Sequence, residues 1–157
     1  MIKLRFLGLA AVAVAAVGVG GTARTGKIAC FDAEVTATIV RQTPTVGGLC
    51  GDGCIVVSWP WVVELRVRRV HSGRLDPGPL TVLNLQHAAY RRDIGARRWW
   101  LRENALGGFN VLQIDGPPLP QCPRGETPEA PFVVPAEGQT LEDLRREGEA
   151  YYGRGDH

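Results

Sequence analysis

The sequence lacks the motifs by which many enzymes are recognised. It contains neither the His-Glu-x-x-His motif of zinc proteases nor the Gly-x-Ser-x-Gly turn of serine hydrolases, and no specific nucleotide-binding or metal-binding signature. A formal charge of +2 over 157 residues also creates no strong field toward nucleic acid or acidic lipid. We therefore predict a protein that is not an enzyme, has no cofactor and does not bind nucleic acid.

The first 23 residues have the layout of a secretory signal peptide. Lys3 and Arg5 precede an uncharged apolar stretch over residues 6–19, and Ala23 offers a small residue for cleavage. The stretch is shorter than the ~20 residues that a transmembrane helix needs. We therefore expect a periplasmic or secreted protein without a stable membrane anchor after cleavage. A retained signal anchor is the alternative, and a lipoprotein acylated at Cys30 is a weaker one.

The four cysteines all follow the expected cleavage site. An even number of cysteines in an exported domain indicates two disulfides, and three pairings are possible. We favour Cys30 with Cys122 and Cys50 with Cys54. The first bridge closes a long loop and should contribute about 4 to 5 kcal/mol on the chain-entropy model, whereas the second closes a very short one.

Helical periodicity is nearly absent before the C-terminus, and there are no internal repeats. Apolar and polar residues alternate instead, which is typical of strands with one solvated face. We expect Trp59, Trp61 and Trp99 to lie in the core or at the mouth of a barrel. Residues 43–53 are rich in Gly, Pro and Thr and should form an irregular excursion. Five strands are predicted, at residues 33–39, 61–70, 80–87, 98–103 and 109–114.

The chain changes character after the last predicted strand. Residues 115–135 hold seven prolines and should form an extended segment on the surface. Thr140 and Asp143 then form a capping box before a short helix, which Gly148 weakens. We divide the chain into a signal peptide (1–23), a β-barrel domain with a proline-rich extension (24–135), and a short C-terminal helix with a tail (136–157).

The spacing of the strands favours a mainly β fold, a small five-stranded OB-like barrel with a short C-terminal helix. Residues 61–82 contain the pattern V-x-x-V-x-x-G at Val67, Val70 and Gly73. This segment resembles the barrel core of bacterial exported OB-fold proteins that are similar to the inhibitory domain of tissue inhibitors of metalloproteinases. The resemblance covers residues 33–114. Those inhibitors begin at a cysteine whose free amine meets the target metal. Because Cys30 is not the first residue after the expected cleavage site, inhibition is not implied.

Arginines interleaved with aromatic residues suggest a binding face. On an OB-like barrel such a face can hold a partner by charge and stacking. The chain should then be an exported non-catalytic binding or envelope-associated domain whose partner is a protein or a polysaccharide. Acidic neighbours such as Glu64 and Glu103 could instead neutralise the arginines in cross-strand pairs. The predicted contact residues are Arg66, Arg68, Arg98, Trp100 and Arg102.

The short segment from Cys50 to Cys54 supports an alternative function. Two thiols at this spacing can close a small disulfide loop or bind a soft metal such as copper(I), with His71 or His87 as further ligands. The alternative is therefore a periplasmic metal-handling or thiol-redox protein. The structural disulfide is the simpler interpretation, because the βαβ pattern of thioredoxin-like carriers is missing.

Thiol titration and metal analysis of the purified mature protein distinguish these two functions. We expect four oxidised cysteines that resist mild reductant, and neither copper nor zinc. Two reactive thiols or a bound metal would support the alternative.

Overall fold

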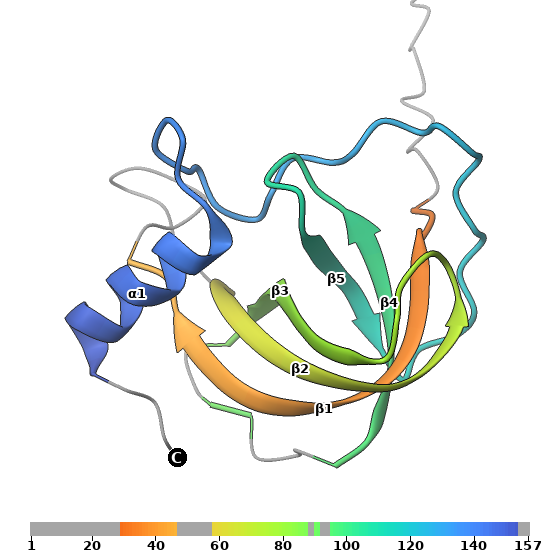
Figure 1. The fold of residues 1–157 in the computed structure, drawn as a ribbon, viewed down its shortest axis with the longest axis horizontal. Helices are drawn as coiled ribbons and strands as arrows, with labels where there is room; N and C mark the ends of the chain where they lie inside the picture. The colour runs from red at the N-terminus through yellow and green to blue at the C-terminus, as the bar shows by residue number, and fades with distance from the viewer. Residues whose placement is uncertain (1–28, 47–57, 88–89, 92–94, 154–157) are drawn as a thin grey trace, which may run out of the picture.

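Five strands and one helix make up the part of the chain that the structure describes. This computed structural model describes residues 29–46, 58–87, 90–91 and 95–153 (Figure 1). The predicted signal peptide and the loop with Cys50 and Cys54 lie outside these residues. The elements are β1 (Ala33–Pro44), β2 (Trp59–Ser72), β3 (Gly78–Gln86), β4 (Arg97–Glu103), β5 (Phe109–Ile114) and α1 (Leu141–Tyr152).

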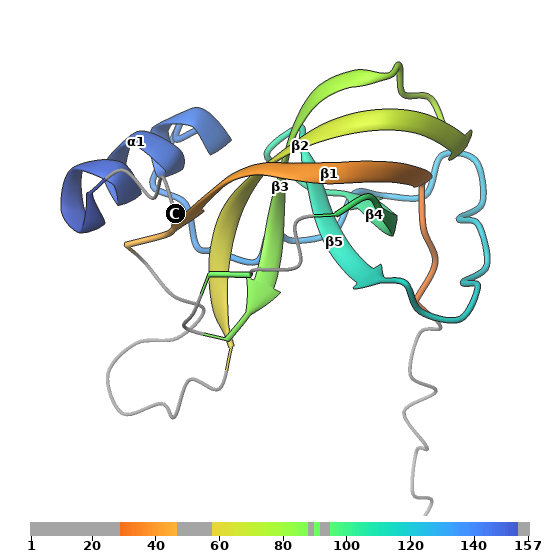
Figure 2. The ribbon, with the colours of Figure 1, turned by 90° about the horizontal axis from the view of Figure 1, so that it is seen from below.

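The strands close into a barrel in the order β1-β2-β3-β5-β4, and β4 returns to β1. Neighbouring strands are antiparallel except β3 and β5, which run parallel and share two residue pairs. Figures 1 and 2 show the helix beside one end of the barrel. The predicted mainly β fold, a small five-stranded OB-like barrel with a short C-terminal helix, is confirmed.

Strand β1 pairs with β2 over almost its whole length and with β4 at its beginning. Its register against β2 shifts at three places, and such bulges bend and twist a strand. One shift leaves Val40 between the pairs Ile39–Leu65 and Arg41–Glu64. The prediction that this strand ends near residue 39 was wrong, because bulges break the simple alternation and the pairing continues to Pro44.

The barrel interior is filled by the inward-facing residues of all five strands. Trp99 and Leu65 are almost completely buried, and Trp61 is 3% exposed. The Trp99 indole N–H donates to the Ala37 carbonyl at 3.1 Å, which satisfies its polar atom inside the core. The expected core position of these two tryptophans is confirmed. The buried cluster comprises Ala33, Val35, Ala37, Trp61, Val63, Leu65, Val67, Val82, Trp99, Leu101 and Val111.

Gly73, the last residue of the V-x-x-V-x-x-G pattern, follows β2 directly and has φ of +98°. A Cβ atom at this position would lie 2.5 Å from the Asp32 carbonyl oxygen and 2.7 Å from Ala33 Cα. The position therefore requires glycine for two reasons, its backbone conformation and the close approach to the start of β1.

The proline-rich extension runs around the outside of the barrel from the end of β5 to the start of α1 (Figure 1). Its Cys122 N–H donates to the Phe31 carbonyl at 2.8 Å, and the Glu129 N–H donates to the Glu103 carbonyl at 2.9 Å. A second apolar cluster joins the extension and the helix to the outer face of β2 and β3. It consists of Val62, Leu83, Val133 and Leu144, with Leu106, Phe132 and Leu141 packed against it.

The helix begins at the capping box that the sequence predicts. Thr140 accepts from the Asp143 N–H at 3.2 Å, and Asp143 accepts from the Thr140 N–H at 3.0 Å. Hydrogen bonds from the Thr140 hydroxyl and N–H, together with Arg146, lower the pKa of Asp143 to about 2. Among the described residues, no helix is long and apolar enough to cross a membrane.

Charged residues attach the same helix to the barrel wall. Arg145 contacts Glu64 of β2 at 3.4 Å and Glu149 at 2.5 Å, and Glu149 also contacts Arg41 of β1 at 3.0 Å. The pKa of Arg145 is raised, mainly by its hydrogen bond to Glu142 and to a smaller extent by its hydrogen bond to Glu149. Burial of the guanidinium opposes this shift. The pKa of Glu142 is lowered, chiefly by its hydrogen bond from Arg145.

Gly148 has a packing role that helix propensity does not reveal. It is buried, and a Cβ atom there would lie 2.2 Å from the Pro44 carbonyl oxygen and 2.8 Å from Thr43 Cγ2. The glycine costs helix propensity, but it lets the helix approach the end of β1.

We expect Gly148→Ala to destabilise the protein by up to about 2 kcal/mol. The overlap with backbone costs about 1 to 3 kcal/mol, and the gain in helix propensity offsets about 1 kcal/mol of it. Urea unfolding, with hydrogen exchange of the helix, measures the effect. Glu147→Ala, at an exposed neighbouring position, is the control and should change stability by less than about 0.5 kcal/mol. A more stable Gly148→Ala variant would contradict this packing role.

Candidate binding surface

The predicted contact residues Arg66 and Arg68 lie on the outer face of β2, and both are exposed. The strand register shifts next to them, because Arg69 faces Thr36 whereas Val67 faces Ala37. This bulge leaves two successive arginines, Arg68 and Arg69, exposed to solvent. The outer face of β2 therefore presents three guanidinium groups within four residues.

The arginines of the barrel and helix divide into paired and unpaired groups. Within the described part of the chain, no ion pair or hydrogen bond involves the side chains of Arg66, Arg68 or Arg69, which we call the β2 arginines. Glu64, which we considered as a neutralising neighbour, contacts Arg41 and Arg145 instead. The arginines paired with carboxylates are Arg41, Arg97, Arg98, Arg102, Arg145 and Arg146.

Arg98 and Trp100 on β4 are less available than the β2 arginines. Arg98 forms an ion pair with Glu34 of β1, and its guanidinium lies 5.6 Å from the centre of the Trp100 ring. Trp100 itself is 3% exposed. A tryptophan buried to this extent offers no open ring for a sugar or base to stack on. Arg98 remains half exposed and lies across β1 from Arg69, since both residues pair with Thr36.

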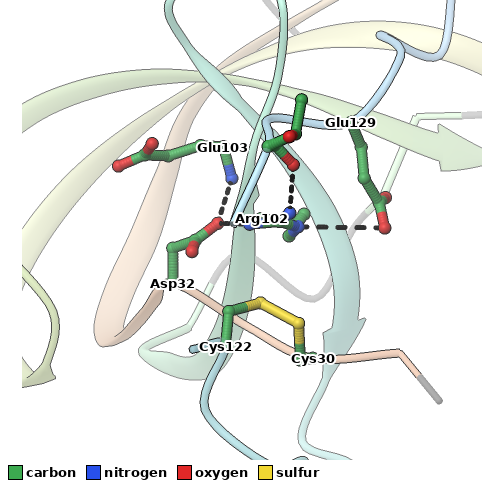
Figure 3. The surroundings of a disulfide bond; sticks show 7 residues. Cys30, Asp32, Arg102, Glu103, Cys122 and Glu129 are labelled. Carbon is green, nitrogen blue, oxygen red and sulfur yellow. Dashed lines mark hydrogen bonds and ion pairs between the residues drawn. A yellow bond between two sulfur atoms is a disulfide. The ribbon is translucent and has the colours of Figure 1, made fainter. Parts of the chain in front are cut away.

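Arg102 is completely buried and does not belong to the binding face. Its guanidinium forms an ion pair with Asp32 at 2.5 Å and donates to the Thr127 carbonyl at 2.5 Å, and Glu129 lies 3.8 Å from its Nε (Figure 3). Asp32 also accepts from the Glu103 N–H at 2.7 Å. No local sequence pattern indicates this burial, because the partners of Arg102 come from segments that precede and follow the sheet. Arg102 therefore holds the extension against the barrel.

A disulfide between Cys30 and Cys122 lies beside this buried arginine (Figure 3). It joins the segment before β1 to the extension over a sequence separation of 92 residues, and the favoured pairing of these two cysteines is confirmed. A polar pocket of about 540 Å³ lies next to it, lined by Asp32, Arg74, Cys122 and Arg124 among others. Its walls mix carboxylates and guanidinium groups, so its charge selects no clear class of ligand.

A groove of about 430 Å³ lies on the outer wall of the barrel beside Arg66. Val40, the residue left over at the β1 bulge, is 57% exposed and lines it. Pro79 and Leu80 of β3 form the opposite side, and Glu64 also lines the groove. Sequence reasoning missed this groove, because the exposure of Val40 follows from the bulge in β1, and the sequence does not reveal that bulge.

The two histidines of the alternative metal site lie at opposite ends of the barrel. His71 is the penultimate residue of the 14-residue β2, and its Nε2 lies 2.8 Å from the Thr36 hydroxyl. His87 directly follows β3, at the other end of the barrel, where Gln86 pairs with Trp59. Cys50 and Cys54 lie outside the described residues. The described residues contain no group of three or more His, Cys, Asp or Glu that could hold a metal.

Comparison with known proteins gives no relative for this chain: no family model, curated protein or solved structure matches it at a significant level. The resemblance to exported OB-fold proteins therefore stays a prediction from the sequence.

We expect Arg102→Met to destabilise the protein by about 3 kcal/mol, because it leaves the Asp32 carboxylate at the barrel end without its cation. Urea unfolding with the disulfide intact measures the loss, and limited proteolysis should show faster cleavage of the extension. Arg146→Met removes an exposed ion pair on the helix and should cost less than about 1 kcal/mol. Equal effects of the two variants would argue against an anchoring role for Arg102.

Proposed function

We propose that this chain is an exported, non-catalytic binding or envelope-associated domain that contacts an anionic protein or polysaccharide through the outer face of β2. The observation that carries this proposal is the state of the β2 arginines. They are exposed, whereas the arginines of β1, β4 and α1 form ion pairs with carboxylates.

Unpaired arginines at adjacent positions repel one another, and an anionic partner relieves this repulsion. Six other arginines of the same chain have carboxylate partners, among them one that is completely buried. A row of unpaired guanidinium groups also attracts anions over a distance and offers bidentate hydrogen bonds to carboxylates at close range. Such a surface favours association speed and specificity for acidic partners.

The site also lies on a rigid support. Val67 and Leu65 alternate with the arginines and are buried in the barrel core, so the backbone of β2 is held from the inside. A binding face on a strand of a closed barrel loses little conformational entropy when a partner binds.

Export is proposed on two grounds that come from different parts of the chain. The first is the charged and then apolar layout of residues 1–23. The second is the Cys30–Cys122 disulfide, since structural disulfides are typical of oxidising compartments. Periplasmic and secreted locations are both consistent with these features.

Two labelled polyanions test the proposed function. We expect poly-L-glutamate or polygalacturonate to bind the mature protein at low ionic strength, and Arg66→Glu or Arg68→Glu to weaken that binding at least about tenfold, equivalent to about 1.4 kcal/mol. Fluorescence anisotropy provides the dissociation constants. Higher salt should weaken binding, because exposed charge pairs are screened.

Arg124→Glu is the matched control, because it makes the same change of net charge at an exposed position on the extension. It should leave the dissociation constants nearly unchanged. If all three variants weaken binding equally, the effect is one of net charge and the β2 face is not the site. If neither polyanion binds the unaltered protein, the proposed function is wrong.

A further inference from the structure

We propose that the groove beside Arg66 receives an extended acidic segment of a partner protein, with one apolar side chain in the groove and carboxylates on Arg66 and Arg68. This inference rests on the proposed function of the β2 face and names its class of partner.

The groove and Arg66 form one continuous surface. Arg66 pairs with Pro79 in the β2–β3 ladder and is itself one of the residues that line the groove. Its exposed guanidinium therefore lies at the edge of a hollow bounded by the apolar side chains of Val40 and Pro79. A partner that places a carboxylate on Arg66 is thereby positioned to bury an adjacent apolar group.

A carboxylate also lines the groove and already has cationic partners. Glu64 lines it, and its carboxylate is already shared by Arg41 at 3.8 Å and Arg145 at 3.4 Å. A second carboxylate beside Glu64 would compete with it for Arg41 and Arg145, so we expect the partner to place an apolar group there. The surface thus combines an apolar groove with the β2 arginines, which begin at its edge with Arg66.

The spacing of the arginines fits a peptide. Arg66 and Arg68 are two residues apart on a strand, which places their backbone positions roughly 6.6 Å apart. Alternate residues of an extended peptide have the same separation and lie on one face. Glutamates at alternate positions can therefore reach both arginines while the peptide runs along β2.

A polysaccharide fits this surface less well. Carbohydrate recognition depends strongly on stacking against exposed aromatic rings, and the tryptophans of the described strands are buried or partly buried. Trp100, whose ring centre lies 5.6 Å from the Arg98 guanidinium, is 3% exposed. The exposed aromatic residues among those described, Tyr151 and Tyr152, lie at the end of α1 and not on the arginine face. The recognition features of this surface are therefore the positive charge of the β2 arginines and the apolar groove. Both suit an acidic peptide that carries an apolar side chain.

Two fluorescein-labelled peptides test the inference. One has glutamates at alternate positions and a central leucine, and the other has serine in place of the leucine. We expect the leucine peptide to bind the mature protein roughly tenfold more tightly, which is the low end of what a single methylene group contributes in a hydrophobic pocket. Arg66→Glu should weaken both peptides, because both use the same carboxylates.

Val40→Ser supplies the specific readout. It should remove most of the preference for leucine while leaving the binding of the serine peptide unchanged, because it alters the groove and not the charge. Val134→Ser is the matched control, since Val134 is an exposed valine on the extension. It should keep the preference intact. Both valines are exposed, at 57% and 76%, so neither change disturbs the core.

The remaining outcomes separate this inference from the proposed function. If polygalacturonate binds in an Arg66-dependent manner and neither peptide does, the proposed function stands and the peptide inference is overturned. If both peptides bind equally, or if Val40→Ser leaves the leucine preference unchanged, the groove is not the apolar site. If no polyanion and no peptide binds, both proposals fail.

Discussion

The structure depends on the pairing of β1 with strands on both of its sides. β1 bonds to β2 and, through its first five residues, to β4, so that the sheet has no free edge at this seam. β1 can pair with both β2 and β4 in a closed barrel only if it bends, and the three register shifts along β1 provide the bend. The same constraint produces the exposed Val40, because a bulge adds a residue that has no partner. The bulges of β1 thus contribute both to the closure of the barrel and to the groove beside Arg66.

A second constraint comes from outside the sheet, where the extension is tied to the start of β1. The Cys30–Cys122 disulfide and the Arg102–Asp32 ion pair lie side by side at this point (Figure 3). The disulfide lowers the conformational entropy of the unfolded chain. The ion pair supplies a counter-charge for the buried Arg102 guanidinium, which would destabilise the fold if it had no partner. Together they fix the extension on the outer wall, where Val133 and Leu144 cover Val62 and Leu83.

The arginines show how one residue type serves two purposes in a small domain. Arg102 and Arg145 hold segments together through buried or half-buried contacts with carboxylates. Arg66, Arg68 and Arg69 stand on a rigid strand and point to solvent. The distinction depends on where the carboxylates lie, since Glu34, Glu64 and Asp32 each face an arginine on another element. A partner for the β2 face must therefore bring its own negative charge.

The sequence by itself determined that there are five strands and where each begins to within a few residues. It also determined the capped helix and the core positions of Trp61 and Trp99, because alternation and capping act over a few neighbouring residues. It also favoured the Cys30–Cys122 bridge by placing the two cysteines on either side of the predicted strands. It could not separate Arg102 from Arg66, since the two differ in no local pattern and are distinguished by Asp32, Thr127 and the extension that packs over one of them. Nor could it show the reason for Gly148, which is a contact with Pro44 more than 100 positions away. Burial and charge pairing are properties of segments brought together by the barrel, and only the tertiary structure decided them.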